Sequence, residues 1–136
     1  MVTLSSADQV RALLDRFGGF FDAVLVQVHL ALPRESAGRH AVIRLLAQEP
    51  VAGGHSHDGW RFVVLRIDGL DAYRLTEGPD SYLVLSDGLQ IRLDEGRSVI
   101  DLSPRDRWPE QTTSAMQSDQ FVSGVRCSYK VEDVCD

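Results

Sequence analysis

The spacing of apolar residues changes once along the chain, near residue 20, and this change constrains the fold more than any other feature. Before it, Val10, Leu13, Leu14 and Phe17 recur at the spacing of one face of a helix. After it, apolar residues recur at every second position for long stretches, which is typical of β-strands. The order of the two patterns predicts one helix followed by a strand-rich body.

The helix is expected over residues 6–17. Ser6 and Gln9 form the Ser-x-x-Gln pattern of a capping box, and Gly18 and Gly19 end the helical pattern. Its apolar stripe covers one side only, so we expect the helix to lie on a sheet. The nearest apolar surface follows the two glycines, and we therefore expect the helix to cover residues 21–25.

The strand-rich body is expected over residues 21–102. Its first strand carries two alternating sets of apolar residues, namely Val24, Val26, Val28, Leu30 and Leu32 on one face and Phe21, Ala23 and Leu25 on the other. A second strand is expected over residues 40–47, after a turn at residues 33–38. The third, from Trp60 to Ile67, is apolar on both faces, which favours a place inside the sheet.

Two hairpins are expected after a short segment at residues 72–76 and a turn at residues 78–80. A two-residue turn at Asp87-Gly88 would mix polar and apolar residues on each face, whereas a three-residue loop at 86–88 would not. We therefore expect the longer loop, with Gly88 left-handed, Leu85 opposite Leu89 and Leu83 opposite Ile91. A two-residue turn at Glu95-Gly96 then sets Ile91 opposite Ile100 and Asp94 opposite Arg97.

The last third of the chain has weaker signals. Residues 103–119 contain two prolines and little periodicity, which indicates a long irregular connection. A final strand is expected over residues 121–131, with a bulge near Gly124 where the alternation changes phase. The whole pattern predicts a single α+β domain spanning residues 1–136, with the amphipathic helix packed on a mainly antiparallel β-sheet of about seven or eight strands.

Composition narrows the functional classes. The 136 residues carry 20 acidic and 14 basic side chains, a net charge of −6, which argues against nucleic-acid binding. No apolar run is long enough to span a membrane, and no secretory leader is visible at the N-terminus. We therefore expect a cytoplasmic protein with no membrane association, in which Cys127 and Cys135 are free thiols.

The sequence offers one constellation that could bind a metal. His55, His57 and Asp58 lie close together in a glycine-rich segment, and two imidazoles beside a carboxylate can ligate zinc. Because further ligands are not evident, we expect no metal and no cofactor, and this segment stays an alternative. The chain also has no Gly-x-Ser-x-Gly elbow, phosphate loop or dinucleotide motif, so we expect a non-enzymatic protein.

Binding to another protein is the function that remains. Acidic residues at the expected turns, Asp68, Asp71, Asp94 and Glu95, could meet a basic partner. Trp108 lies in a polar segment, where an aromatic ring either folds back onto the sheet or contacts a partner. These five residues are the predicted partner-binding set.

A family resemblance supports this interpretation. The Phe21-Asp22-Ala23 opening of an alternating strand, then Trp60 with its apolar strand to Gly69-Leu70, resembles small bacterial polymorphic-toxin immunity-protein domains, over residues 17–102. A His often precedes the Asp-Ala pair in those families, whereas here the position is Phe21. The resemblance implies a protein that blocks a toxin, here a basic one, and it transfers no catalytic residue. A self-associating structural domain, forming a homo-oligomer, and a metal- or small-molecule-binding domain using the His55-His57 segment are the alternatives.

Overall fold

The chain forms an α+β domain composed mostly of strands. The computed structural model describes residues 1–35, 37–50, 59–75, 84–85, 87–103 and 120–134. The described elements, in chain order, are β1 (Val2–Leu4), α1 (Ala7–Arg16), the 3-10 turn η1 (Gly18–Phe20), β2 (Ala23–Ala31), β3 (His40–Gln48), β4 (Trp60–Asp68), β5 (Ala72–Arg74), β6 (Val84–Leu85), β7 (Gln90–Asp94), β8 (Arg97–Asp101), β9 (Phe121–Gly124) and β10 (Arg126–Asp133).

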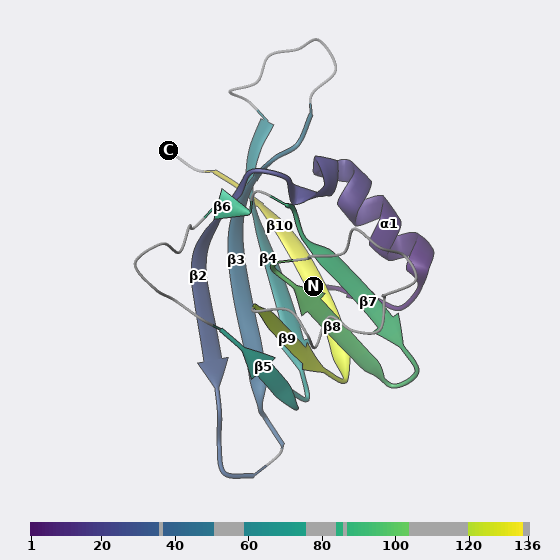
Figure 1. The fold of residues 1–136 in the computed structure, drawn as a ribbon, viewed down its shortest axis with the longest axis vertical. Helices are drawn as coiled ribbons and strands as arrows, with labels where there is room; N and C mark the ends of the chain where they lie inside the picture. Colours follow the sequence, from purple (N-terminus) through teal and green to yellow (C-terminus); the bar gives the residue numbers. More distant parts are fainter. Residues whose placement is uncertain (36, 51–58, 76–83, 86, 104–119, 135–136) are drawn as a thin grey trace.

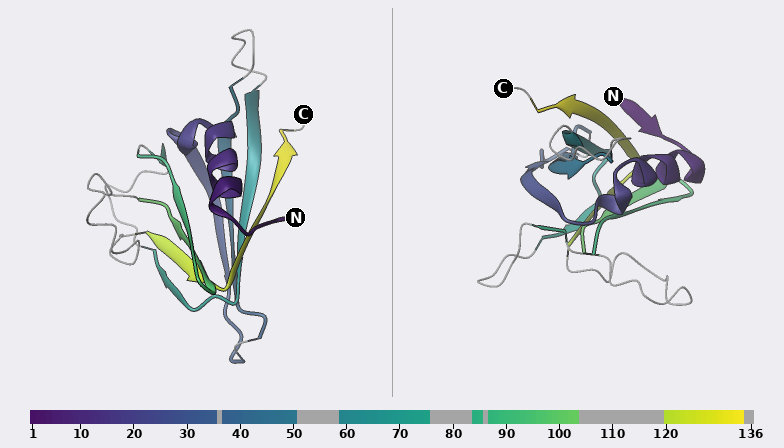
Figure 2. Two further views of the ribbon diagram at one scale, coloured as in Figure 1. Left: turned by 90° about the vertical axis from the view of Figure 1, so that its right-hand side faces the viewer. Right: turned by 90° about the horizontal axis from the view of Figure 1, so that it is seen from above.

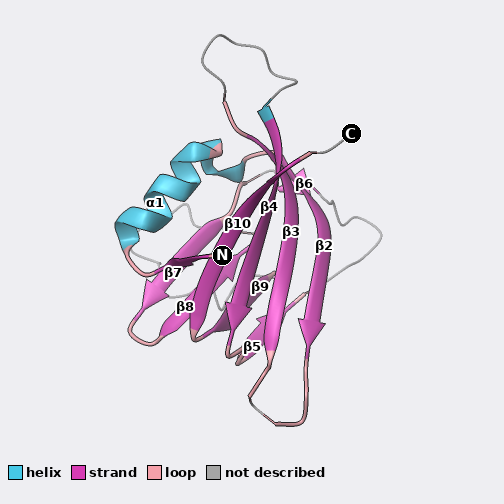
Figure 3. Ribbon diagram, turned by 180° about the vertical axis from the view of Figure 1, so that it is seen from behind, coloured by secondary structure: helices cyan, strands magenta, loops and turns pink. Residues whose placement is uncertain are grey.

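These strands form two antiparallel sheets rather than the single sheet that the alternation predicted. The larger has the order β1-β10-β4-β3-β2-β6 and the smaller β5-β9-β8-β7 (Figure 1). Figure 2 shows the sheets close together at one end and apart at the other, with α1 between them toward the wider end. Seen from behind, the opposite side of the larger sheet carries no helix (Figure 3).

The helix begins and ends close to where the sequence predicts. The Ser6 side chain caps it by accepting a hydrogen bond from the Gln9 backbone N–H at 3.2 Å. The Gln9 side chain reaches back, as expected, but accepts from the backbone N–H of Ser5 at 2.7 Å and not from that of the cap residue Ser6. Val10 and Leu13 are buried, so the predicted apolar stripe is the face that enters the core.

The predicted position of the helix over residues 21–25 is wrong. Phe21 remains 63% exposed, and the helix instead contacts β7. The reason is the η1 turn, where left-handed backbone at Gly18, Gly19 and Phe20 reverses the chain. Phe20 is consequently fully buried, and its ring stacks on Phe17 at 5.2 Å between centroids.

The face assignment of β2 is also corrected. Its register against β3 shifts between Leu25 and Gln27, so a bulge interrupts the strict alternation. Leu25 and Val28 therefore both pack against the core, and Val26 is 50% exposed. The inward-facing residues of β2, namely Ala23, Leu25, Val28 and Leu30, therefore come from both predicted sets, because the phase changes at the bulge.

The second hairpin has the predicted register, with Ile91 opposite Ile100 and Asp94 opposite Arg97. The first does not form, because β6 pairs with β2 in the larger sheet while β7 belongs to the smaller one. Gly88 is nevertheless left-handed, with φ of +75°, as predicted. The connection at Gly88 thus joins two sheets instead of two neighbouring strands; Leu83 lies outside the described residues.

The predicted final strand is two strands in different sheets. β9 pairs with β8 and β5, whereas β10 pairs with β4 and β1, and Val125 alone separates them. The phase change read as a bulge is the point where the chain passes between sheets. β4 occupies the interior of the larger sheet, as its two apolar faces predicted, and the short edge strand β1 was not predicted.

Candidate functional site

The predicted acidic residues come together at the end where the sheets converge. Asp68 and Asp71 lie at the connection from β4 to β5, and Asp94 and Glu95 lie at the β7–β8 turn. Asp94 and Glu95 are exposed. The structure therefore gathers four of the five predicted partner-binding residues into one region, while Trp108 lies outside the described residues.

Two of these carboxylates have partners within the chain. Asp68 accepts from the Arg66 side chain at 2.9 Å. Asp71 accepts from the Ser123 hydroxyl at 2.6 Å and from Arg97 at 3.3 Å, and Arg97 also donates to that hydroxyl at 2.9 Å. Because Ser123 is fully buried, the Asp71 contacts hold β5, β8 and β9 together at this edge.

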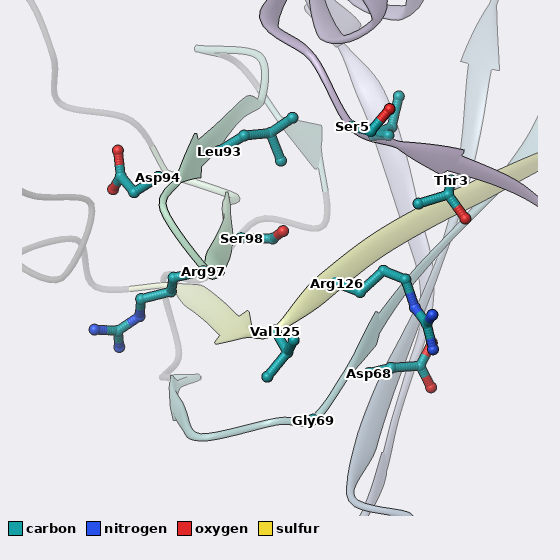
Figure 4. A pocket seen from close by; sticks show the side chains of 11 residues that line it. Thr3, Ser5, Asp68, Gly69, Leu93, Asp94, Arg97, Ser98, Val125 and Arg126 are labelled. Atoms are coloured by element: carbon teal, nitrogen blue, oxygen red, sulfur yellow. The ribbon is translucent and has the colours of Figure 1, made fainter.

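A cleft of about 600 Å³ lies beside this region, between β1, the end of β4 and the β7–β8 turn (Figure 4). Its charged lining residues are Asp68, Asp94, Arg97 and Arg126. Two carboxylates and two guanidinium groups balance one another. The cleft thus has mixed charge, in contrast to the acidic surface that the sequence predicted here.

The predicted histidine segment, His55, His57 and Asp58, lies outside the described residues. Within the part that the structure describes, no group of three or more His, Cys, Asp or Glu side chains is placed to hold a metal ion. His29 and His40, which the sequence did not connect, lie on neighbouring strands with their rings 6.1 Å apart. The backbone carbonyl of Gly38 lies 2.8 Å from Nδ1 of His40.

The Cys127 thiol is a core group. It is free and fully buried, and burial raises its pKa from the ordinary value near 9 to about 12. A thiol held in its neutral form is a poor nucleophile. The predicted free thiol at Cys127 is confirmed, and Cys135 lies outside the described residues.

The strongest candidate site is the side of β2, β3, β4 and β10 that points away from the smaller sheet, here called the outer face. Alternation fixes its members, because Ile43 and Leu45 of β3 and Val63 and Leu65 of β4 are fully buried on the inner side. The residues between them point outward. Figure 3 shows this side of the sheet without a covering helix.

An apolar row crosses the outer face from strand to strand. Consecutive Cα pairing aligns Val84 with Val24, Val24 with Leu46, and Leu46 with Phe62. Val84 is 43% exposed, and the other three are partly exposed. The row joins β6, β2, β3 and β4, so four apolar side chains lie side by side on one accessible surface.

Basic side chains lie next to this row. The Arg44 guanidinium lies over the Phe62 ring, 4.2 Å from its centroid. Arg44 in turn aligns with Val64, and Val64 with Lys130 of β10. The outer face therefore combines the apolar row with basic side chains, Arg44 and Lys130, on either side of Val64.

The sequence pattern indicates that these residues are apolar strand residues but does not indicate that they share a surface. Both faces of the strand from Trp60 to Ile67 are apolar in the sequence, which predicts a place inside the sheet. Among the described residues, however, the one α-helix has ten residues and lies on one side only. The sequence therefore predicts more apolar strand faces than one helix can cover, and this mismatch indicates an uncovered sheet face.

Comparison with known proteins adds no family. No protein-family model matches the chain, and no curated protein or solved structure shows significant similarity to it. Among the described elements, no helix has the length and apolar character needed to cross a membrane.

Proposed function

We propose that this chain is a non-enzymatic protein-binding domain and that its partner docks on the outer face. The observation that supports this most directly is the row of Val84, Val24, Leu46 and Phe62, aligned across four strands on an accessible surface. Contiguous apolar surface surrounded by polar groups is typical of interaction sites. Blocking a toxin is one form of such binding, and the sequence resemblance favours it.

The dimensions of the outer face suit a small protein interface. β2, β3 and β4 each have nine residues and β10 has eight. With strands about 4.8 Å apart and a rise of about 3.3 Å per residue, they present roughly 20 by 30 Å, or about 600 Å² in projection. One partner of a typical complex contributes about 800 Å² of accessible surface, so the outer face has the right scale.

Three reactive side chains of the described residues are held in structural contacts. Catalysis needs groups that are free to react or transfer protons. Cys127 is buried in the core, and Asp68 and Asp71 accept hydrogen bonds from neighbouring side chains. A binding function, in contrast, needs only the surface that these contacts maintain.

The test is affinity capture from the native cell lysate with three baits. One is the wild-type protein, the second combines Leu46→Thr with Phe62→Thr on the outer face, and the third combines Tyr73→Thr with Val125→Thr. Tyr73 and Val125 are exposed apolar residues elsewhere, 41% and 62% exposed, so the third bait is a matched control. Circular dichroism checks that all three are folded.

We expect a partner that is captured by the wild type and the control but lost from the outer-face variant. Light scattering on the same samples reports self-association, and a dimer abolished only by the outer-face changes would support the homo-oligomer alternative. Identical captured proteins and identical masses for all three baits would refute the outer face as a docking site.

A further inference from the structure

We infer that the partner presents acidic and aliphatic side chains to the outer face, an inference that rests on the proposed binding function. Four basic residues, Arg44, Arg66, Arg126 and Lys130, point to this side, against two acidic ones, Asp68 and Glu132. The imidazoles of His29 and His40 lie on the same side. This surplus of positive charge is opposite in sign to the net charge of −6 of the chain.

Both acidic residues of the outer face have basic partners. Asp68 pairs with Arg66 at 2.9 Å, and Glu132 lies 3.8 Å from Lys130. Arg126 lies opposite Asp68 in the β10–β4 pair, and Asp68 is already bound by Arg66. Arg44 has no carboxylate within ion-pair distance in the described part of the chain. The four basic and two acidic side chains of the outer face therefore leave a surplus of positive charge for an incoming carboxylate.

Arg44 is held in place before any partner arrives. Its guanidinium stacks on Phe62 at 4.2 Å, and its Nε atom is buried without a hydrogen-bond partner in the described structure. Arginine binds carboxylates through a planar fork of N–H groups, and stacking on an aromatic ring reduces the motion lost on binding. A partner carboxylate beside the apolar row would meet a pre-oriented group.

The side chains of the apolar row favour a polypeptide over a nucleic acid. Single-stranded nucleic acids bind to sheets mainly by stacking bases on exposed aromatic rings. Here the Arg44 guanidinium already lies over the ring of Phe62, and the other members of the row, Val84, Val24 and Leu46, are aliphatic. Aliphatic side chains pack against aliphatic partners and offer nothing specific to a base.

A second copy of the chain is a poorer match. Two outer faces brought together would place the Arg44, Arg126 and Lys130 surplus of one copy near the same surplus of the other. Like charges facing each other across an interface lower affinity. A basic partner at this face would meet the same repulsion, so the charge distribution favours an acidic protein.

Three fluorescent probes test this inference in anisotropy titrations at low salt. They are a short peptide of alternating Glu and Leu, its Lys and Leu counterpart, and single-stranded poly(U) RNA. The key variant combines Arg44→Gln with Arg126→Gln. The matched control combines Arg11→Gln on α1 with Arg92→Gln on β7, and removes the same charge from other parts of the molecule.

We expect the acidic peptide to bind the wild type and the control, and to bind the Arg44→Gln/Arg126→Gln variant about tenfold more weakly, the scale of two partly exposed charge contacts. Tighter binding of the basic peptide or of the RNA would overturn the inference. So would equal affinity of the acidic peptide for the wild type and the charge variant.

The lysate capture, repeated with the charge variant, separates this inference from the proposed function. Loss of the captured partner from both the charge variant and the Leu46→Thr/Phe62→Thr variant supports both proposals. If the captured partner is lost only from the Leu46→Thr/Phe62→Thr variant, the result supports the outer face as the docking site and refutes the acidic partner. Capture unaffected by either pair of changes refutes both.

Discussion

Replacing Gly88 with alanine tests how the larger sheet, the smaller sheet and the helix region are joined. Gly88 lies between β6 and β7 with φ of +75°, and a Cβ atom there would lie 2.5 Å from the carbonyl oxygen of Gly19. That oxygen accepts the hydrogen bond from the Leu89 N–H at 3.1 Å. The side chain would therefore press on the backbone that positions the buried Phe20.

Gly96 is the matched control for Gly88→Ala. It is also left-handed, with φ of +68°, but a Cβ atom there would have no neighbour within 4 Å. Gly96→Ala therefore measures only the cost of placing alanine in a left-handed conformation. This cost is about 1 kcal/mol, because alanine also lowers the entropy of the unfolded chain and so offsets part of the strain. Gly88→Ala adds overpacking against backbone, typically 1–3 kcal/mol, so we expect a total of about 2–4 kcal/mol.

Urea denaturation followed by far-ultraviolet circular dichroism measures both variants under the same conditions. We expect a lower urea midpoint for Gly88→Ala than for Gly96→Ala. If the free energy of unfolding depends on urea concentration with a similar slope in both variants, the difference is one of stability and not of the surface exposed on unfolding. Equal losses for the two variants would refute the close approach of residues 19 and 88. The conformational argument alone would then account for both glycines.

Three further predictions concern the junction of the sheets and the core. Gly124→Ala should destabilise the fold by about 1–3 kcal/mol in urea titrations, because a Cβ atom would overlap the Ile67 side chain and lie 2.8 Å from the Asp68 carbonyl oxygen. Burial raises the pKa of Cys127 from near 9 to about 12, so the folded state favours the neutral thiol. The free energy of unfolding should therefore fall as pH rises from about 9 toward 12. If the urea midpoint changes as much between pH 8 and 10.5 in a Cys127→Ala variant as in the wild type, the prediction is wrong. Ser123→Ala should cost about 1–3 kcal/mol in urea titrations, because Asp71 loses its 2.6 Å hydrogen bond at a buried site; an unchanged midpoint would show that the hydroxyl does not support this edge.

The elements that could be predicted from the sequence are those fixed by local patterns. The helix at Ala7–Arg16 follows from its cap and its apolar stripe, and the β7–β8 hairpin from a two-residue turn with matching side chains. The central place of β4 follows from its two apolar faces. Each of these depends on residues within about ten positions of one another, so no knowledge of distant contacts was needed.

The division into two sheets depends on distant contacts and was missed. Alternation states which side of a strand is apolar but does not state which strand lies beside it. A single residue, Val125, takes the chain from β9 in one sheet to β10 in the other, and in the sequence this looks the same as a bulge. The bulge of β2 had the opposite effect, because it divides inward-facing residues such as Leu25 and Val28 between two alternating sets.

The outer face depends on distant contacts in the same way, whereas the acidic turns do not. Turn residues such as Asp68 and Asp71 are conspicuous in a sequence, yet their carboxylates are bound by Arg66 and Ser123 in the fold. The outer face becomes visible only when strand order is known, because Val24, Leu46 and Phe62 are far apart in the chain and adjacent only through pairing. The positive charge of the outer face likewise depends on which side of each strand a basic residue occupies. The net charge of the chain does not contain this information. A chain that is acidic as a whole can therefore present a basic and apolar surface, and the sign of the partner must be inferred from that surface.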